Sequence, residues 1–248
     1  MSRTARPAPL LLCLLLCLSG ASGCASQRWV TEPLTVAARC EACGERAGPG
    51  SGGRWVPDGR VTCAACLARA VVDDDEAEDL LEEARDLLDD VVGVEVEGPV
   101  SVQLASRPEL FAGAPELAHP NLRAYCQIRE VLRGKEVVSR EFHVFALGGL
   151  PRENLRGILC HELFHVAQGQ AGGASDDADP AFREGAACWV QVLVHRDLDE
   201  PRWAEQLLAS RDRTYGGGLR RFVRLAEARG QEAALKLALT GKRFPPGY

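Results

Sequence analysis

The sequence carries His161, Glu162 and His165 in the pattern His-Glu-x-x-His. Residues four apart lie on one face of an α-helix, so the two imidazoles can reach one metal ion. Glu162 is then placed to take a proton from a water bound to that ion. The rest of this stretch is apolar, which predicts a buried helix: Ile158, Leu159, Leu163, Phe164 and Val166. The pattern therefore predicts a catalytic zinc site.

A short motif of this kind also arises by chance, so the third ligand matters. Catalytic zinc commonly takes three protein ligands, and two histidines with one glutamate form one such set. Glu184 follows His165 by nineteen residues, near the start of a second predicted helix opened by Pro180. The Gly- and Asp-rich segment 169–179 predicts a loop that turns the chain back. The alternative is that Glu184 is a solvated carboxylate near the positive end of a helix dipole.

A second constellation consists of two Cys-x-x-Cys pairs separated by nineteen residues: Cys40, Cys43, Cys63 and Cys66. Four thiolates at such spacing predict a structural zinc ion in a zinc-ribbon or LIM-like module. The interval fits a hairpin with strands at 54–56 and 61–62. The alternative is a pair of disulfides, which an exported protein could form. Three further cysteines follow later in the chain and are expected to be buried free thiols: Cys126, Cys160 and Cys188.

Composition limits the classes of function. The chain has 248 residues, of which 46% are hydrophobic, enough for one core and a small module. Its net charge is −6, so the clustered Lys and Arg that nucleic-acid binding needs are not expected. The expected partner is instead a peptide or protein substrate, which fits the predicted zinc site.

Residues 1–23 predict a signal peptide. Arg3 and Arg6 precede the apolar run Leu10–Leu18, which is too short to span a bilayer. Small residues then stand directly before Cys24, as in bacterial lipoprotein signals, where this cysteine becomes the lipidated N-terminus. We therefore expect attachment to a membrane through Cys24 in the bacterial cell envelope. No Asp follows Cys24, so by resemblance to the known sorting rule the outer membrane is expected. The alternative is cleavage without lipidation, giving a secreted or periplasmic protein.

The remaining segments divide the chain further. We assign a linker to 24–36, the four-Cys module to 37–69, an acidic amphipathic helix to 70–92 and the main domain to 93–248. In the main domain, alternating residues predict strands at 94–97 and 100–104 and a hairpin of 125–132 with 137–147. Three helices are expected at the end of the chain, over 203–210, 219–228 and 232–239.

Two shorter features bear on a substrate. Phe142–Leu147 precedes the metal helix and is expected to be the edge strand that holds an extended peptide through its backbone. Tyr215 precedes three glycines, which predict a tight loop. Its side chain either packs in that turn or provides the phenol that steadies a reaction intermediate.

Four local patterns follow one another in the second half of the chain. Gly149–Pro151 leads into Ile158–His165, Glu184 and Gly185 are followed by Cys188, and the sequences Tyr215–Arg220 and Thr240–Pro245 come last. Together they resemble the peptidase domain of the plant LIM-domain, ubiquitin-activated peptidases that limit organ growth, and of their bacterial relatives. The resemblance covers about residues 145–248.

This resemblance implies an α+β, zincin-like fold and a Glu-type zinc metallopeptidase. It places His161, His165 and Glu184 on zinc and makes Glu162 the base. Only one four-Cys set is present and no ubiquitin-binding segment is found, so neither activation by ubiquitin nor the family's substrates are carried over. Better-known Glu-type peptidases have an Asp one turn after the Glu ligand. Cys188 stands at that position here, and the sequence does not identify another acceptor for the ligand histidine.

The sequence thus predicts a membrane-anchored, exported zinc metallopeptidase with one catalytic and one structural zinc ion. Two alternatives of other classes stay open. One is a zinc-stabilised binding or scaffold lipoprotein with a vestigial peptidase site, although such a protein would not need Glu162. The other is a zinc hydrolase that acts on a non-peptide bond.

Overall fold

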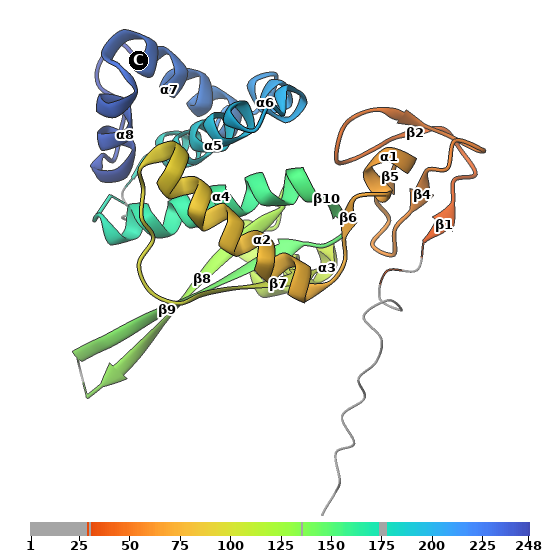
Figure 1. Cartoon of the computed structure of the whole chain (residues 1–248), viewed down its shortest axis with the longest axis horizontal. Helices are drawn as coiled ribbons and strands as arrows, with labels where there is room; N and C mark the ends of the chain where they lie inside the picture. The colour runs from red at the N-terminus through yellow and green to blue at the C-terminus, as the bar shows by residue number, and fades with distance from the viewer. Residues whose placement is uncertain (1–28, 30, 135, 174–177) are drawn as a thin grey trace, which may run out of the picture.

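The computed structural model describes residue 29 and residues 31–134, 136–173 and 178–248. The predicted signal peptide and Cys24 lie outside the described residues. Within the described part the chain is a mixed α+β protein, as predicted (Figure 1). None of its described helices is both long enough and apolar enough to cross a lipid bilayer.

The described residues begin with a small module of short strands, which starts at Glu32 and so includes the end of the segment assigned to a linker. Three of them form a sheet in the order β1-β4-β5, and β2 pairs with β3. The predicted hairpin is confirmed, with Arg54 of β4 opposite Thr62 of β5. A single helical turn, α1, follows. The bounds are β1 Glu32–Pro33, β2 Ala38–Arg39, β3 Arg46–Ala47, β4 Arg54–Trp55, β5 Val61–Thr62 and α1 Ala64–Leu67.

The predicted acidic helix is also confirmed. After β6 (Ala70–Val71), α2 covers Asp74–Leu87 and continues as a π-helical turn to Val92. Asp73 caps the helix by accepting hydrogen bonds from the backbone amides of Asp75 and Glu76. The acidic side chains at this end also interact favourably with the positive end of the helix dipole. The apolar face is buried in the main core, through Ala77, Leu80, Leu81, Ala84 and Leu88.

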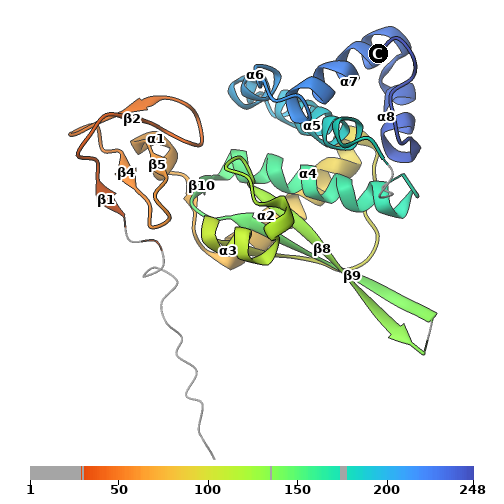
Figure 2. The same ribbon diagram turned by 180° about the vertical axis from the view of Figure 1, so that it is seen from behind.

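A three-stranded sheet in the order β7-β9-β8 supports the rest of the domain. β7 (Val100–Ala105) runs parallel to β9 (Glu136–Leu147), which forms an antiparallel hairpin with β8 (Ala124–Arg133). The tip of this hairpin projects beyond the body of the protein (Figure 1). Helix α3 (Arg107–Gly113) covers the face of the sheet where the rings of Tyr125 and Phe145 stack (Figure 2). A 3-10 turn at Pro115–Leu117 follows α3.

The predicted edge strand is wrong. Phe142–Leu147 forms the end of the central strand β9 and pairs with β7 on one side and β8 on the other. The parallel partner β7 comes from earlier in the chain, and local sequence does not reveal such a distant pairing. The strand with an unpaired side next to the metal helix is therefore β8.

The strand predicted at 94–97 is also wrong. Val94 and Val96 are buried and Glu95 and Glu97 are exposed, so the alternation exists. The segment has no strand partner, however. The backbone of Glu97 instead exchanges two hydrogen bonds with the side chain of Gln170.

The two outer edges of the sheet differ. On the β7 edge, the Asp74 carboxylate of α2 accepts a hydrogen bond from the backbone amide of Leu104 at 2.8 Å. One turn later, Glu78 accepts from the amide of Val102 at 3.0 Å. Carboxylates of the acidic helix thus occupy donors that an incoming strand would need. No such cap is present on the described residues of β8.

Helix α4 (Arg152–Gln170) lies in the middle of the molecule (Figure 1). The sheet and α2 contact one side of it, and α5 (Pro180–Asp197) crosses the other. Nearly all of α4 from Leu155 to Gln168 is buried. A helix packed on all sides in this way has little freedom to tilt, which suits an element that is predicted to hold metal ligands.

The three predicted C-terminal helices are confirmed as α6 (Pro201–Leu208), α7 (Tyr215–Arg229) and α8 (Gln231–Thr240). The tight loop predicted at Gly216–Gly218 is wrong, because these glycines form the first turn of α7. A Cβ atom on Gly218 would overlap the backbone of Ala181 and Gly185 in α5. The glycines are therefore needed for close helix packing rather than for a turn.

Candidate metal centres

The three predicted ligands from α4 and α5 meet at one point. His161 Nε2 and His165 Nε2 lie 3.1 Å apart. Glu184 Oε2 lies 3.2 Å from His165 Nε2 and 3.3 Å from His161 Nε2. All three side chains are largely buried, with exposed fractions of 11–19%. The four-residue spacing and the helix crossing thus place three donor atoms in one compact triangle.

This triangle fits a zinc ion. Zinc binds imidazole nitrogen and carboxylate oxygen at about 2.0–2.2 Å, so neighbouring donors of a tetrahedron lie roughly 3.3–3.5 Å apart. The three donor separations are at or just below this value. A two-histidine, one-glutamate set also leaves one position of a tetrahedron for water or substrate. The residues present therefore fit a catalytic rather than a structural zinc ion.

Local sequence explains how Glu184 reaches its position. Pro180 opens α5, and the Asp179 carboxylate accepts a hydrogen bond from the amide of Ala181 at 3.0 Å. Gly185 then permits the close approach of α7. The Oε1 atom of Glu184 faces the Arg183 guanidinium at 3.2 Å, and the other oxygen faces the histidines. The alternative of a solvated carboxylate is thereby excluded.

The charges of the triangle support one another. Burial opposes ionisation of Glu184, but His165 and His161 outweigh it and hold the pKa of Glu184 below its usual value. Burial likewise disfavours the charged form of His165. The carboxylate of Glu184 outweighs that effect and raises the pKa of His165 to about 9. A cation placed among these donors would take over the role of that proton.

Both predicted ligand histidines have a partner on their far nitrogen. Gln168 was not predicted from the sequence. Cys188 stands at the expected position, although another acceptor was expected there. The Oε1 atom of Gln168 lies 2.8 Å from His165 Nδ1. The sulfur of Cys188 lies 3.8 Å from His161 Nδ1. Gln168 stands three residues after His165, a spacing that brings side chains together on a helix and could have drawn attention to it.

Glu162, the predicted base, is buried beside the triangle but is not one of its members. Burial raises the pKa of Glu162, and the histidines oppose this effect only in part. A raised pKa suits a carboxylate that must accept a proton and pass it on near neutral pH. The partly buried thiol of Cys126, on the inner face of β8, also lies within electrostatic range of Glu162.

Tyr215 occupies the first position of α7, close to the triangle. Its ring centre lies 6.5 Å from that of His161. Burial and then the charge of Glu184 raise the pKa of Tyr215, so the phenol keeps its proton. Tyr215 also lines a hollow of about 230 Å³ together with Leu117, Leu122 and Asp212. The side chain is therefore a hydrogen-bond donor at the rim of the site.

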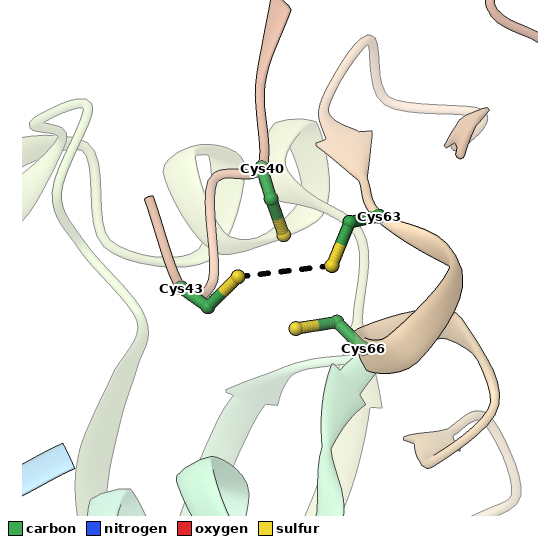
Figure 3. Close-up of side chains that lie close together, drawn as sticks. All are labelled: Cys40, Cys43, Cys63 and Cys66. Atoms are coloured by element: carbon green, nitrogen blue, oxygen red, sulfur yellow. Dashed lines mark hydrogen bonds between the residues drawn. The ribbon is translucent and has the colours of Figure 1, made fainter. Parts of the chain in front are cut away.

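The four cysteines of the N-terminal module also converge (Figure 3). Their sulfur atoms all lie within 4.8 Å of one another, and those of Cys43 and Cys63 are 3.7 Å apart. Zinc–sulfur bonds of about 2.3 Å put neighbouring sulfurs of a tetrahedron roughly 3.8 Å apart. A hydrogen bond from Cys66 lowers the pKa of Cys40 to about 4, and the same interaction raises the pKa of Cys66, so Cys40 is the member of this pair that ionises first. This cluster also fits a tetrahedral metal ion.

All seven described cysteines are free thiols. The four sulfur atoms of the cluster thus lie together without a disulfide bond in this structure. The predicted free thiols outside the cluster are confirmed, with Cys160 and Cys188 buried and Cys126 partly buried.

The four-Cys module is joined firmly to the main domain. Glu41, within the first cysteine pair, forms ion pairs with Arg107 and Arg123, the residue directly before β8. Arg60 donates a buried hydrogen bond to the carbonyl of Gly148 at 2.7 Å. β6 pairs with β10 (Leu150–Pro151), which leads directly into α4. The module is therefore built into the support of both β8 and the metal helix.

Comparison with known proteins adds no relative to this description. A scan against protein-family models and searches of curated proteins and of solved structures found no match to the chain.

Proposed function

We propose that this protein is a zinc metallopeptidase. The observation that carries the proposal is the triangle of His161, His165 and Glu184 with the buried carboxylate of Glu162 beside it. Three metal ligands and an adjacent carboxylate are the groups that hydrolysis by a zinc-activated water requires. The arrangement of a central ligand helix, a mixed sheet with an open strand and a second helix with the glutamate supports a zincin-like fold.

Zinc held by these three side chains would lower the pKa of a water and polarise the carbonyl of the scissile bond. Glu162 accepts the proton of the attacking water and delivers it to the leaving amine. The Tyr215 phenol, which keeps its proton, donates a hydrogen bond to the oxyanion that develops on the substrate. Gln168 and Cys188 keep the ligand histidines oriented.

The open edge of β8 supports a peptide as the substrate. An extended peptide can add to such an edge through backbone hydrogen bonds. The opposite edge of the sheet is capped by Asp74 and Glu78, so β8 is the strand available. Beyond the Tyr215 hollow, a second one of about 570 Å³ lies between Ile128 of β8 and Gly169 at the end of α4.

We further propose that the four-Cys cluster holds a structural zinc ion and that the mature protein is attached to the envelope membrane through lipidated Cys24. The full set of sulfur ligands leaves no position for substrate, so a structural role fits this ion. The envelope location rests on the sequence of residues 1–24.

Incubation with a diverse pool of peptides, followed by mass spectrometry, tests the proposal. The parent protein should produce new peptide termini, and Glu162→Gln with an equal zinc content should not. Cleavage of ester or other non-peptide probes without any peptide cleavage would point to the hydrolase alternative. Zinc binding without any hydrolysis would support the vestigial-site alternative and contradict the proposal.

A further inference from the structure

Gln168 connects the metal centre to the C-terminal helix. It lies one turn beyond His165 on α4 and is almost completely buried, with 2% of its surface exposed. Its Oε1 atom is 2.8 Å from His165 Nδ1. Its Nε2 atom donates to the carbonyl of Ala238 in α8 at 2.9 Å. A buried amide thus has a partner at each end, one of them a ligand histidine and the other a backbone group.

The Ala238 carbonyl decides which way this amide points. A carbonyl can only accept, so the end of Gln168 that faces Ala238 must be the NH2 group. The other end is then the amide oxygen, which can only accept. His165 must therefore carry a proton on Nδ1, which leaves Nε2, the atom that faces His161 and Glu184, as the nitrogen that can bind a metal ion.

Ala238 is available for this role because of its place in the helix. α8 ends at Thr240, so the Ala238 carbonyl is one of the last four, which have no amide partner within the helix. The hydrogen bond from Gln168 satisfies that carbonyl and at the same time fixes α8 against α4. The C-terminal segment also reaches the third ligand. The carbonyl of Lys242 accepts from the amide of Asp179, which begins α5, and Phe244 packs on Phe182, two residues before Glu184.

We infer that Gln168 is a positioning residue that holds His165 in the tautomer that binds metal, and that docking of α8 thereby sets the affinity of the site for zinc. The inference rests on the proposed metal site. It adds that an element without any metal ligand contributes to the affinity. Loss of such an orienting partner commonly costs about 10- to 100-fold in metal affinity.

The first test compares three side chains at position 168. Zinc affinity of the His161–His165–Glu184 site is measured by competition with a chromophoric chelator, on protein that keeps its cysteine-bound ion. Gln168→Leu should weaken the affinity by about 10- to 100-fold. Gln168→Glu should weaken it less, because one carboxylate oxygen can still accept from His165. Gln170→Leu is the matched control, since that amide lies on the same helix and bonds the backbone of Glu97.

A second readout reports the tautomer directly. In the zinc-loaded parent, the nitrogen NMR signals of His165 should show a protonated Nδ1, and this state should become mixed in Gln168→Leu. If that variant fails to fold, Gln168→Met carries the same measurement, because it keeps the length of the side chain but has no amide. An affinity of Gln168→Leu within threefold of the parent value, with an unchanged tautomer, would overturn the inference.

The role of α8 is tested with Gly173→Ala. A Cβ atom at Gly173 would overlap the carbonyl of Leu239, so this change displaces the end of α8. Introduced alone, Gly173→Ala should lower the zinc affinity. Added to Gln168→Leu, it should cause little further loss, because both changes break the connection between Gln168 and Ala238. Fully additive losses would overturn the proposed link. If the parent bound no zinc at this site, the proposed function would be wrong. That result differs from a parent that binds zinc and is unaffected by the substitutions, which would overturn only the role of Gln168 and α8.

Discussion

Cys188 Sγ lies 3.8 Å from His161 Nδ1, whereas Nε2 of the same ring lies 3.3 Å from Glu184 Oε2. A thiol therefore occupies the place where better-known Glu-type zinc peptidases are expected to have a carboxylate. Burial, followed by the charge of Glu184, raises the pKa of Cys188, so the sulfur is a neutral and weak acceptor.

From this relationship we expect Cys188→Ala to lower zinc affinity by less than about 10-fold, below the usual effect of removing an orienting partner. The measurement is chelator competition under the conditions used for the parent. A loss as large as that of a removed carboxylate partner would show that the thiol orients His161 much more strongly than its chemistry suggests.

Metal content should be two zinc ions per chain, because two separate ligand sets fit the ion. Combined replacement of His161 and His165 by alanine should remove one ion and leave the one bound by cysteine. Elemental analysis of purified protein measures both values. A content of one zinc in the parent, with the four cysteines found oxidised, would refute the structural zinc site.

Glu162→Gln should separate metal binding from chemistry. Glu162 is not in the ligand triangle, so zinc content should stay at the parent value, while peptide cleavage should fall by at least ~10²-fold, the lower range for a positioned general base. Glu184→Gln should differ, because it weakens a ligand and should lower zinc affinity together with rate. Full cleavage by Glu162→Gln at unchanged zinc content would remove the proposed mechanism.

Tyr215→Phe should keep the zinc and reduce the rate on the order of 10- to 10²-fold, because only one hydrogen bond to the oxyanion is lost. The effect should fall on kcat rather than on KM, since the bond forms as charge develops. Unchanged kcat would assign Tyr215 a packing role at the start of α7.

Acid stability should depend on Glu200. Its carboxylate accepts from His195 Nδ1 at 2.8 Å and pairs with Arg156 of α4. Burial opposes the ionisation of Glu200, but His195 and Arg156 outweigh this effect and lower the pKa of Glu200. The stabilisation is therefore complete above the unfolded-state pKa of about 4.3 and is lost as pH falls through the lower pKa of the folded state.

Glu200→Gln should accordingly lower the unfolding free energy at pH 7 by about 1–3 kcal/mol, the range for removing a charged partner from partly buried hydrogen bonds. The difference from the parent should shrink at pH values below about 4. Urea unfolding at several pH values measures both. A difference that stays constant down to pH 2 would contradict the ionic explanation.

Attachment to the membrane should depend on Cys24. In a bacterial host, the mature protein should begin with an acylated Cys24, and Cys24→Ser should move it to the soluble fraction. Mass spectrometry of the N-terminus decides the matter, because an unmodified terminus in the parent would support the secreted or periplasmic alternative.

The ligand set could be predicted from sequence because its determinants are local. His161 and His165 are related by one helical turn, and Glu184 lies near the start of the next helix. The partners of these ligands could not be predicted in the same way. Gln168 and Cys188 become acceptors only through side-chain rotamers and helix crossings that depend on the whole fold.

The same division holds for the fold. The β8–β9 hairpin follows from the alternation of residues and a nearby turn. The prediction that Phe142–Leu147 of β9 is an edge strand is wrong because β7, from a distant part of the chain, pairs with its free side. The glycines at 216–218 have low helix propensity and predict a loop. Packing against Ala181 and Gly185 overrides that propensity, which only the assembled structure reveals.

The unequal edges of the sheet have a consequence for the protein at high concentration. With Asp74 and Glu78 bound to the backbone of β7, a second copy that extends this sheet by strand pairing would use β8. That is the strand proposed to hold the peptide. Self-association of this kind would therefore compete with substrate, and specific activity would fall as enzyme concentration rises and recover when peptide is in excess.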